Sequence, residues 1–219
     1  MSQRAQLRRR VRGLYVITDA GLQPPARLPE RVLQAIRGGA RMVQYRDKGR
    51  DAARRLGEAE ALAALCRRHG VLFIVNDDVE LAVAVAADGV HVGREDGAVA
   101  DARAALGPER LVGASSYNDP ERAVQLQAEG ADYVAFGTFF PSPTKPHAVR
   151  ATPEMLRAVR PRLQVPVVAI GGITAAKAGP VVAAGADALA VISDVFGAAD
   201  VTAAARAYAP LFRDGEAAG

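Results

Sequence analysis

The sequence contains little cysteine, no tryptophan and few other aromatic residues, and it has no long apolar run. A single cysteine, Cys66, excludes an internal disulfide and fits a reducing compartment, so we expect a cytoplasmic protein. No apolar stretch reaches the ~18 residues that a membrane-spanning helix needs. The basic first residues are not followed by the apolar core of a signal peptide. These absences exclude a disulfide-stabilised secreted domain and predict no membrane partner.

Several functional motifs are also missing. The chain has no GxGxxG dinucleotide loop after its first strand, no Walker phosphate loop and no GxSxG nucleophile elbow. Zinc is not expected, because Cys66, His69 and His91 lack the spacing of zinc ligands. His91 and His147 could act as acids or bases, but nothing in the local sequence singles them out.

Charge is unevenly distributed along the chain. Residues 1–12 hold five arginines and no acid, and without them the formal net charge of +4 becomes −1. The remainder is therefore nearly neutral, so the high isoelectric point does not indicate nucleic-acid binding. We expect residues 1–12 to form a disordered basic arm, with contact to a partner subunit or a polyanion as the alternative.

What the sequence does contain is a repeated alternation of two patterns. Eight short β-branched runs are each followed by an Ala- and Leu-rich stretch of helical period. The expected strands are 14–18, 42–46, 72–76, 89–92, 111–114, 133–137, 167–170 and 188–192. The expected helices are 28–38, 51–69, 78–86, 98–106, 119–129, 152–160, 174–184 and 198–209.

Eight strands, each followed by a helix, is the count of a closed parallel barrel. We therefore predict an α/β protein with a single-domain (β/α)₈ TIM barrel over residues 13–211 and a flexible tail over 212–219. An open doubly wound sheet is the competing architecture, but it usually has fewer strands, and its dinucleotide-binding form would carry the missing GxGxxG loop. In such barrels the active site lies at the carboxyl ends of the strands.

The second expected strand ends in cations. Gln44, Arg46 and Lys48 are two residues apart, so in an extended chain they share one face. An amide, a guanidinium and an ammonium directed into one mouth suit an anion such as a diphosphate. An ion pair between these cations and Asp47, or another nearby acid, is the alternative.

Carboxylates follow the next two expected strands. Asp77 and Asp96 could approach closely because adjacent strands run about 4.8 Å apart. Two close carboxylates repel unless one is protonated or a cation lies between them. Oxygen ligands beside a phosphate favour Mg²⁺. A helix-capping role is the alternative for Asp96.

The last three strand ends carry groups suited to phosphate. Ser142, Thr144 and Lys145 lie among prolines after the sixth strand, where a stiff loop could donate to phosphate oxygens. Gly171-Gly172 and Ile192-Ser193 follow the seventh and eighth strands, where such barrels commonly bind a phosphate. A plain surface turn and tight connecting turns are the respective alternatives.

Taken together, eight segments resemble the thiamine-phosphate synthase family, from Gly13 to about residue 210. Each falls in order on its expected strand, which makes the set specific although each string alone is weak. The segments are GLYVITD (13–19), QYRDKG (44–49), FIVNDDVELA (73–82), ADGVHVGREDG (87–97), VGASS (112–116), DYVAFGTFFPSPTKP (132–146), VPVVAIGGIT (165–174) and GADALAVIS (185–193).

The resemblance implies a transferase. It would join hydroxymethylpyrimidine diphosphate to thiazole phosphate, giving thiamine phosphate and pyrophosphate, with Mg²⁺ held by Asp77 and Asp96. The resemblance implies pyrimidine diphosphate ligands at Gln44, Tyr45, Arg46, Asp47, Lys48, Asn76, Ser115 and Lys145. It implies thiazole phosphate ligands at Ser142, Pro143, Thr144, Gly172, Ile192 and Ser193. Arg46, Lys48 and Lys145 would stabilise charge on the leaving group.

A few residues differ from the family pattern, and other functions are possible for such a barrel. The family often has a histidine after the fifth-strand serine, where this chain has Ser116 and Tyr117, and Ser142 stands where threonine is frequent. A thiazole tautomerase-like isomerase and a phosphoribosyl-handling isomerase are the enzyme alternatives. A non-catalytic phosphate-binding regulator is the alternative from another class. The expected partners are small phosphorylated substrates, and assembly into a homo-oligomer stays open.

Overall fold

The computed structural model describes residues 1–93, 97–141 and 150–215. Eight parallel strands form a closed barrel in the order of the sequence, with β8 paired to β1. This confirms the predicted single (β/α)₈ barrel. The strands are β1 (Gly13–Ile17), β2 (Ala40–Tyr45), β3 (Leu72–Asn76), β4 (Gly89–Val92), β5 (Leu111–Tyr117), β6 (Tyr133–Gly137), β7 (Val167–Ile170) and β8 (Ala188–Val191).

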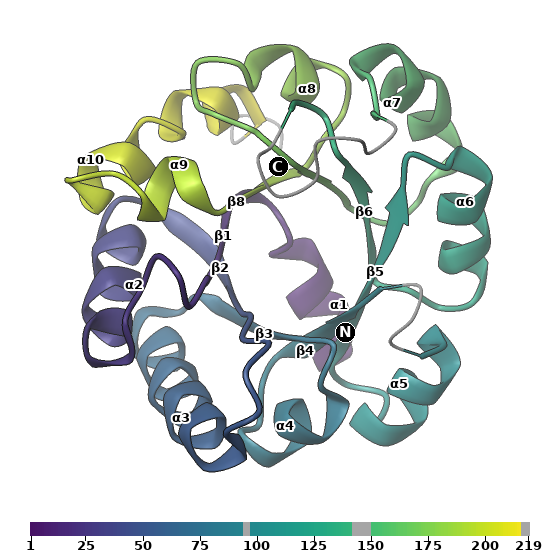
Figure 1. Cartoon of the computed structure of the whole chain (residues 1–219). Helices are drawn as coiled ribbons and strands as arrows, with labels where there is room; N and C mark the ends of the chain where they lie inside the picture. The colour runs from purple at the N-terminus through teal and green to yellow at the C-terminus, as the bar shows by residue number, and fades with distance from the viewer. Residues whose placement is uncertain (94–96, 142–149, 216–219) are drawn as a thin grey trace.

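Helices surround the ring of strands on the outside, as Figure 1 shows. Aspartate or threonine side chains cap several of them, for example Asp51 on the amide of Arg54 and Thr152 on the amide of Met155. The α-helices are α1 (Gln3–Arg9), α2 (Leu28–Arg37), α3 (Ala52–His69), α4 (Val79–Ala84), α5 (Val99–Leu106), α6 (Pro120–Ala128), α7 (Pro153–Val159), α8 (Gly179–Ala183), α9 (Ser193–Phe196) and α10 (Val201–Arg206). The 3₁₀ helices are η1 (Pro25–Arg27), η2 (Arg160–Arg162) and η3 (Ala209–Gly215).

Strand alternation divides the core into two layers. Side chains such as Met42 and Ile74 belong to an inner cluster that fills the barrel. Their neighbours Val43 and Val75 belong to an outer cluster between the strands and the helices. The interior of the barrel is therefore a packed core and not a pore.

The basic first residues are helical, in contrast to the disordered arm that we expected from their composition. Helix α1 lies in the middle of the ring when the barrel is viewed along its axis (Figure 1). Leu7 and Val11 are buried and belong to the inner cluster. Arg10 donates to the carbonyl of Gly70, which precedes β3, so α1 closes the amino-terminal end of the barrel. Burial of these two apolar side chains is what the arginine-rich composition concealed.

Carboxylates at the amino-terminal end of the barrel interact with arginines of residues 1–12. The fully buried Asp132, just before β6, pairs with Arg4 at 2.6 Å and also contacts Arg103. Burial raises the pKa of Asp187 before β8, and the nearby charge of Arg12 opposes this increase. The arginines of the arm therefore neutralise carboxylates at the closed end, far from the mouth. In the described residues, no helix is long and apolar enough to cross a membrane.

Candidate active site at the barrel mouth

The predicted ligands within the described residues lie at or near the carboxyl ends of several strands, which meet at one mouth. Gln44 and Asn76 lie near the ends of β2 and β3, and Ser115 lies in the second half of β5. Ile192 directly follows β8, and Ser193 begins the short helix α9. A closed ring of strands thus brings together residues that are more than 140 positions apart in the sequence.

Lys48 and Asp77 form an ion pair that links the ends of β2 and β3. The amide of Asn76 donates to the same oxygen of Asp77 at 2.5 Å. Asp77 adopts a left-handed backbone with φ of 62°, and its amide donates to the carbonyl of His91 at 2.8 Å. The site therefore presents a carboxylate beside an ammonium whose side chain is still 61 % exposed.

Arg46 is held at the mouth through its backbone. Its amide donates to the hydroxyl of Thr18 at 2.9 Å, and that hydroxyl donates back to the Arg46 carbonyl at 3.3 Å. The guanidinium lies 3.8 Å from Asp19, a distance longer than that of a close charge-assisted bond. The side chain of Arg46 is therefore only loosely bound and can turn to an anion.

A chain of buried polar groups crosses the barrel below the mouth. The Gln44 amide donates to the hydroxyl of Tyr15 at 2.7 Å, and the hydroxyls of Tyr15 and Tyr133 lie 3.2 Å apart. The Tyr133 hydroxyl lies 3.2 Å from Nδ1 of His91, and Nε2 of His91 lies 2.9 Å from the hydroxyl of Ser115. Two predicted substrate ligands, Gln44 and Ser115, are thus joined through the core.

One direction of proton donation satisfies all four of these contacts. Burial raises the pKa values of Tyr15 and Tyr133, so both hydroxyls keep their protons. With Gln44 donating to Tyr15, each tyrosine can donate to the next group, and neutral His91 can donate from Nε2 to Ser115. The carbonyl oxygen of Gln44 and the hydroxyl proton of Ser115 then remain available to a ligand.

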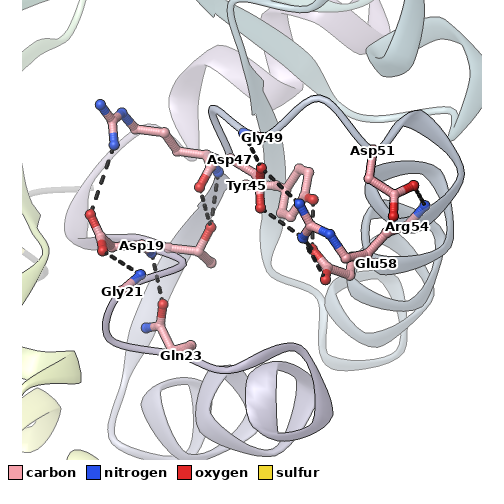
Figure 2. A network of polar contacts seen from close by, with 11 residues as sticks. Asp19, Gly21, Gln23, Tyr45, Asp47, Gly49, Asp51, Arg54 and Glu58 are labelled. Atoms are coloured by element: carbon pink, nitrogen blue, oxygen red, sulfur yellow. Dashed lines mark hydrogen bonds and ion pairs between the residues drawn. The ribbon is translucent and has the colours of Figure 1, made fainter.

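The side chains of Tyr45 and Asp47 turn toward helix α3 instead of into this mouth, and their role as ligands of the pyrimidine diphosphate stays a prediction. Alternation along β2 places Tyr45 in the outer cluster, where its hydroxyl donates to Glu58 at 2.7 Å. Asp47 accepts two bonds from Arg54, at 2.8 and 3.1 Å. The ion pair that we considered between Asp47 and the cations beside it is replaced by one with an arginine of helix α3, while Lys48 and Arg46 face other nearby acids, Asp77 and Asp19. Figure 2 shows this group beside Asp19 and its neighbours.

The glycines after β7 allow two loops to pack closely. Gly171 and Gly172 have φ values of 103° and 62°. A Cβ atom on Gly172 would come within 2.6 Å of the Pro141 carbonyl oxygen and 2.8 Å of the Phe140 carbonyl oxygen. The Phe140 amide also donates to the Gly171 carbonyl at 2.9 Å. These glycines therefore bring the β6 and β7 loops together at the mouth.

Some predicted ligands lie outside the described residues. They are Asp96, Ser142, Pro143, Thr144 and Lys145. Among the residues that the structure does describe, no group of three or more His, Cys, Asp or Glu side chains could hold a metal. Asp77 is thus the one predicted magnesium ligand whose surroundings can be stated.

Sequence reasoning did not find the tyrosines or the arginine that support the site. Tyr15 and Tyr133 occupy inward positions of their strands, where a hydroxyl in an apolar core could have been the signal. Arg54 follows Asp47 by seven residues, and no local periodicity relates a loop to the helix after it.

The fold and the groups at the barrel mouth together define a class of protein. A (β/α)₈ barrel with cations, an amide and a carboxylate at its carboxyl-terminal mouth is an enzyme that acts on small phosphorylated substrates. Its cationic groups come from the β2 end, and its carboxylate comes from the β3 end.

Comparison with known proteins narrows this class. The family model described as thiamine monophosphate synthase matches residues 14–195. The thiamine-phosphate synthase of Aromatoleum aromaticum is 56 % identical over 203 residues, which cover 93 % of this chain and 97 % of the relative. That of Halorhodospira halophila is 56 % identical over 194 residues, which cover 89 % and 91 %.

A solved structure agrees with these relatives. Thiamine phosphate pyrophosphorylase from Pyrococcus furiosus is 37 % identical and superposes with a TM-score of 0.85, covering 95 % of this chain and 98 % of that one. 3-Hexulose-6-phosphate synthase, at 19 % identity and a TM-score of 0.67, shares the fold alone. The chain belongs to the thiamine monophosphate synthase family. These relatives do not support the isomerase or regulator alternatives.

Proposed function

We propose that this enzyme condenses hydroxymethylpyrimidine diphosphate with thiazole phosphate, giving thiamine phosphate and pyrophosphate. The observation that carries the proposal is the mouth itself, where Lys48 meets Asp77 and Arg46 is bound mainly through its backbone. These cations are placed to hold a diphosphate between the ends of β2 and β3. Family membership over nearly the whole chain supports the same reaction.

The pyrimidine ring is assigned to the groups that the buried polar chain orients. The carbonyl oxygen of Gln44 would accept from the ring's amino group, and the hydroxyl of Ser115 would donate to the ring or its diphosphate. Asn76, whose amide donates one N–H to Asp77, would donate the other to the diphosphate. Lys145, from the loop after β6, is proposed as a third cation on the leaving group.

The thiazole phosphate is assigned to the opposite side of the mouth. Gly172, Ile192 and Ser193 would offer backbone amides to its phosphate, where barrels of this class commonly bind one. The proposed ligands from the β6 loop are Ser142, Pro143 and Thr144. Holding the thiazole nitrogen in line with the pyrimidine methylene carbon turns a bimolecular attack into a positioned one.

The carboxylate of Asp77 suits a magnesium ion. Lys48 and Asn76 both contact Oδ2 of Asp77, so the other carboxylate oxygen, Oδ1, is the one that could bind a metal ion. Mg²⁺ binds through one or two carboxylates plus substrate phosphates, and Asp77 with the predicted ligand Asp96 would supply that set. When bound, the metal would neutralise charge on the diphosphate.

The chemistry needs no enzyme nucleophile. As pyrophosphate leaves, Arg46, Lys48 and Lys145 stabilise the negative charge that develops on its oxygens. The electron-rich pyrimidine ring stabilises the positive charge on the methylene carbon. The role of the protein is to orient two substrates and to exclude competing water.

The test is release of pyrophosphate by the purified chain. We expect release only when both substrates and Mg²⁺ are present, in equal amounts with thiamine phosphate. Release without thiazole phosphate, or condensation that persists in excess chelator, would contradict the proposal. A cytoplasmic location and a homo-oligomeric state stay predictions.

A further inference from the structure

The loop between β2 and α3 is held by Asp47, the residue that separates Arg46 from Lys48. The side chain of Asp47 is only 4 % exposed, although it lies in a loop. Its carboxylate accepts from Arg54 Nη1 at 2.8 Å, from Arg54 Nη2 at 3.1 Å and from the Gly49 amide at 2.6 Å. A bidentate guanidinium–carboxylate pair of this kind fixes orientation as well as position. Arg46 and Lys48 flank this fixed point.

Arg54 is itself fixed from the other side. Its Nη1 lies 2.9 and 3.0 Å from the two carboxylate oxygens of Glu58, one turn further along α3. Tyr45, the last residue of β2, donates its hydroxyl to the same carboxylate at 2.7 Å. Figure 2 shows Arg54 between Asp47 and Glu58 at the start of the helix. Strand, loop and helix are thus tied together by one guanidinium.

The positive charge of Arg54 offsets the repulsion between the carboxylates of Asp47 and Glu58. Bonds from Arg54 are the main cause that holds the pKa of Asp47 below its ordinary value. Without Arg54, two carboxylates, Asp47 and Glu58, would face each other with little solvent, and like charges so placed repel. The loop would then move, and Arg46 and Lys48 would move with it.

We propose that Arg54 is a positioning residue for the diphosphate: through Asp47 it sets Arg46 and Lys48 at the mouth, while Glu58 and Tyr45 hold Arg54 in place. The inference rests on the proposed function for the identity of the anion. Arg54 does not need to touch substrate, because it lies on the outer side of β2, in contact with the side chains that alternate away from the mouth.

The experiment compares Arg54→Met with Arg160→Met in the full chain. Arg160 is a matched control: its side chain is 33 % exposed against 29 % for Arg54, and it also pairs with an aspartate, Asp187, but at the closed end of the barrel. Binding of inorganic pyrophosphate with Mg²⁺ is measured by calorimetry. The KM of each substrate and the urea unfolding midpoint are measured alongside.

For Arg54→Met we expect pyrophosphate affinity to fall by about tenfold or more, the size of one lost charge-assisted interaction. The KM for thiazole phosphate should stay within about twofold, since its assigned groups lie across the mouth. Arg160→Met should lower the unfolding midpoint and leave pyrophosphate affinity unchanged. Arg54→Lys should recover part of the affinity, because an ammonium can still reach one carboxylate oxygen.

A folded Arg54→Met variant with wild-type pyrophosphate affinity would overturn the inference, as would equal losses in both arginine variants. Should Arg54→Met not fold, Glu58→Gln decides instead, with an expected loss of about threefold or more in pyrophosphate affinity and wild-type affinity counting against the inference. The proposed function is tested separately: a wild-type chain that binds pyrophosphate but forms no thiamine phosphate would refute that function and leave the role of Arg54 intact.

Discussion

At the scale of single residues, the hydroxyls of Tyr15 and Tyr133 belong to the buried polar chain that links Gln44 to Ser115, the two proposed ligands of the pyrimidine diphosphate. Tyr15→Phe removes the acceptor of the Gln44 amide and frees that amide to rotate. We expect kcat/KM for the pyrimidine diphosphate to fall about tenfold, which corresponds to about 1.4 kcal/mol for one buried hydrogen bond. Steady-state kinetics with varied pyrimidine diphosphate measures this effect.

The second substrate provides the internal control for this variant. The KM for thiazole phosphate should change by less than about twofold, since its proposed ligands follow β6, β7 and β8. An equal loss for both substrates, together with a lowered unfolding midpoint, would indicate general damage to the core. Such a result would remove the orienting role from Tyr15.

At Gly172, both the backbone conformation and the surrounding carbonyl oxygens disfavour any residue with a Cβ atom. Gly172→Ala places a Cβ atom within 2.6 Å of the Pro141 carbonyl oxygen, at a φ of 62°. We expect a loss of about 1–3 kcal/mol in the free energy of unfolding, because steric and backbone strain add. Urea unfolding measures the loss, and the KM for thiazole phosphate should rise with it.

The matched control for that glycine is Gly57→Ala, within α3. A Cβ atom there meets nothing within 4 Å, so the change should stabilise the protein by about 0.5–1 kcal/mol. If both alanines had the same small effect, the close loop contact at Gly172 would carry no energetic weight.

Site residues were predictable only where the strand period applied. Gln44, Arg46 and Lys48 were predicted to share one face because side chains alternate along an extended chain, and the structure has Gln44 bonded to Tyr15 and Lys48 paired with Asp77. The same rule, applied fully, would have placed Tyr45 and Asp47 on the opposite face, where the structure has them. The pairing of Asp47 with Arg54 depends on how a loop meets its helix, which sequence spacing alone does not give.

At the scale of elements, the eight strands follow the predicted runs closely. β3, β4, β6 and β7 begin and end where they were expected, because continuous β-branched runs are bounded by glycine and polar residues. Helix α8 is shorter than predicted and begins at Gly179, next to Pro180, which suits a first turn. The short helix α9 was not predicted, since four residues carry no measurable period.

Helix α1 is the element that composition misjudged, and its contribution can be measured. Leu7→Ala should lower the free energy of unfolding by about 2–3 kcal/mol, because the side chain is buried in the inner cluster. Leu56→Ala, at an exposed leucine of α3, should change it by less than about 0.5 kcal/mol. Urea denaturation measures the free energy of unfolding of both variants. Equal losses would show that helix α1 does not stabilise the amino-terminal end of the barrel.

At the scale of the whole molecule, closure of the ring explains why a site could be assembled from sequence. Parallel strands in a closed barrel place all their carboxyl ends at one mouth, so any residue that ends a strand is a candidate. The amino-terminal end is used differently, with α1 and its arginines covering it. One end is therefore specialised for chemistry and the other for stability.

The pairing of β1 with β8 also constrains how the polypeptide is made. Gly13–Val16 are the first barrel residues to leave the ribosome, and their partners Ala188–Val191 emerge about 175 residues later. At about 5–20 residues per second, the first strand waits on the order of ten seconds or more with an open edge. An open edge can pair with other nascent chains, so the edge of β1 is protected only once β8 has been made and has paired with it.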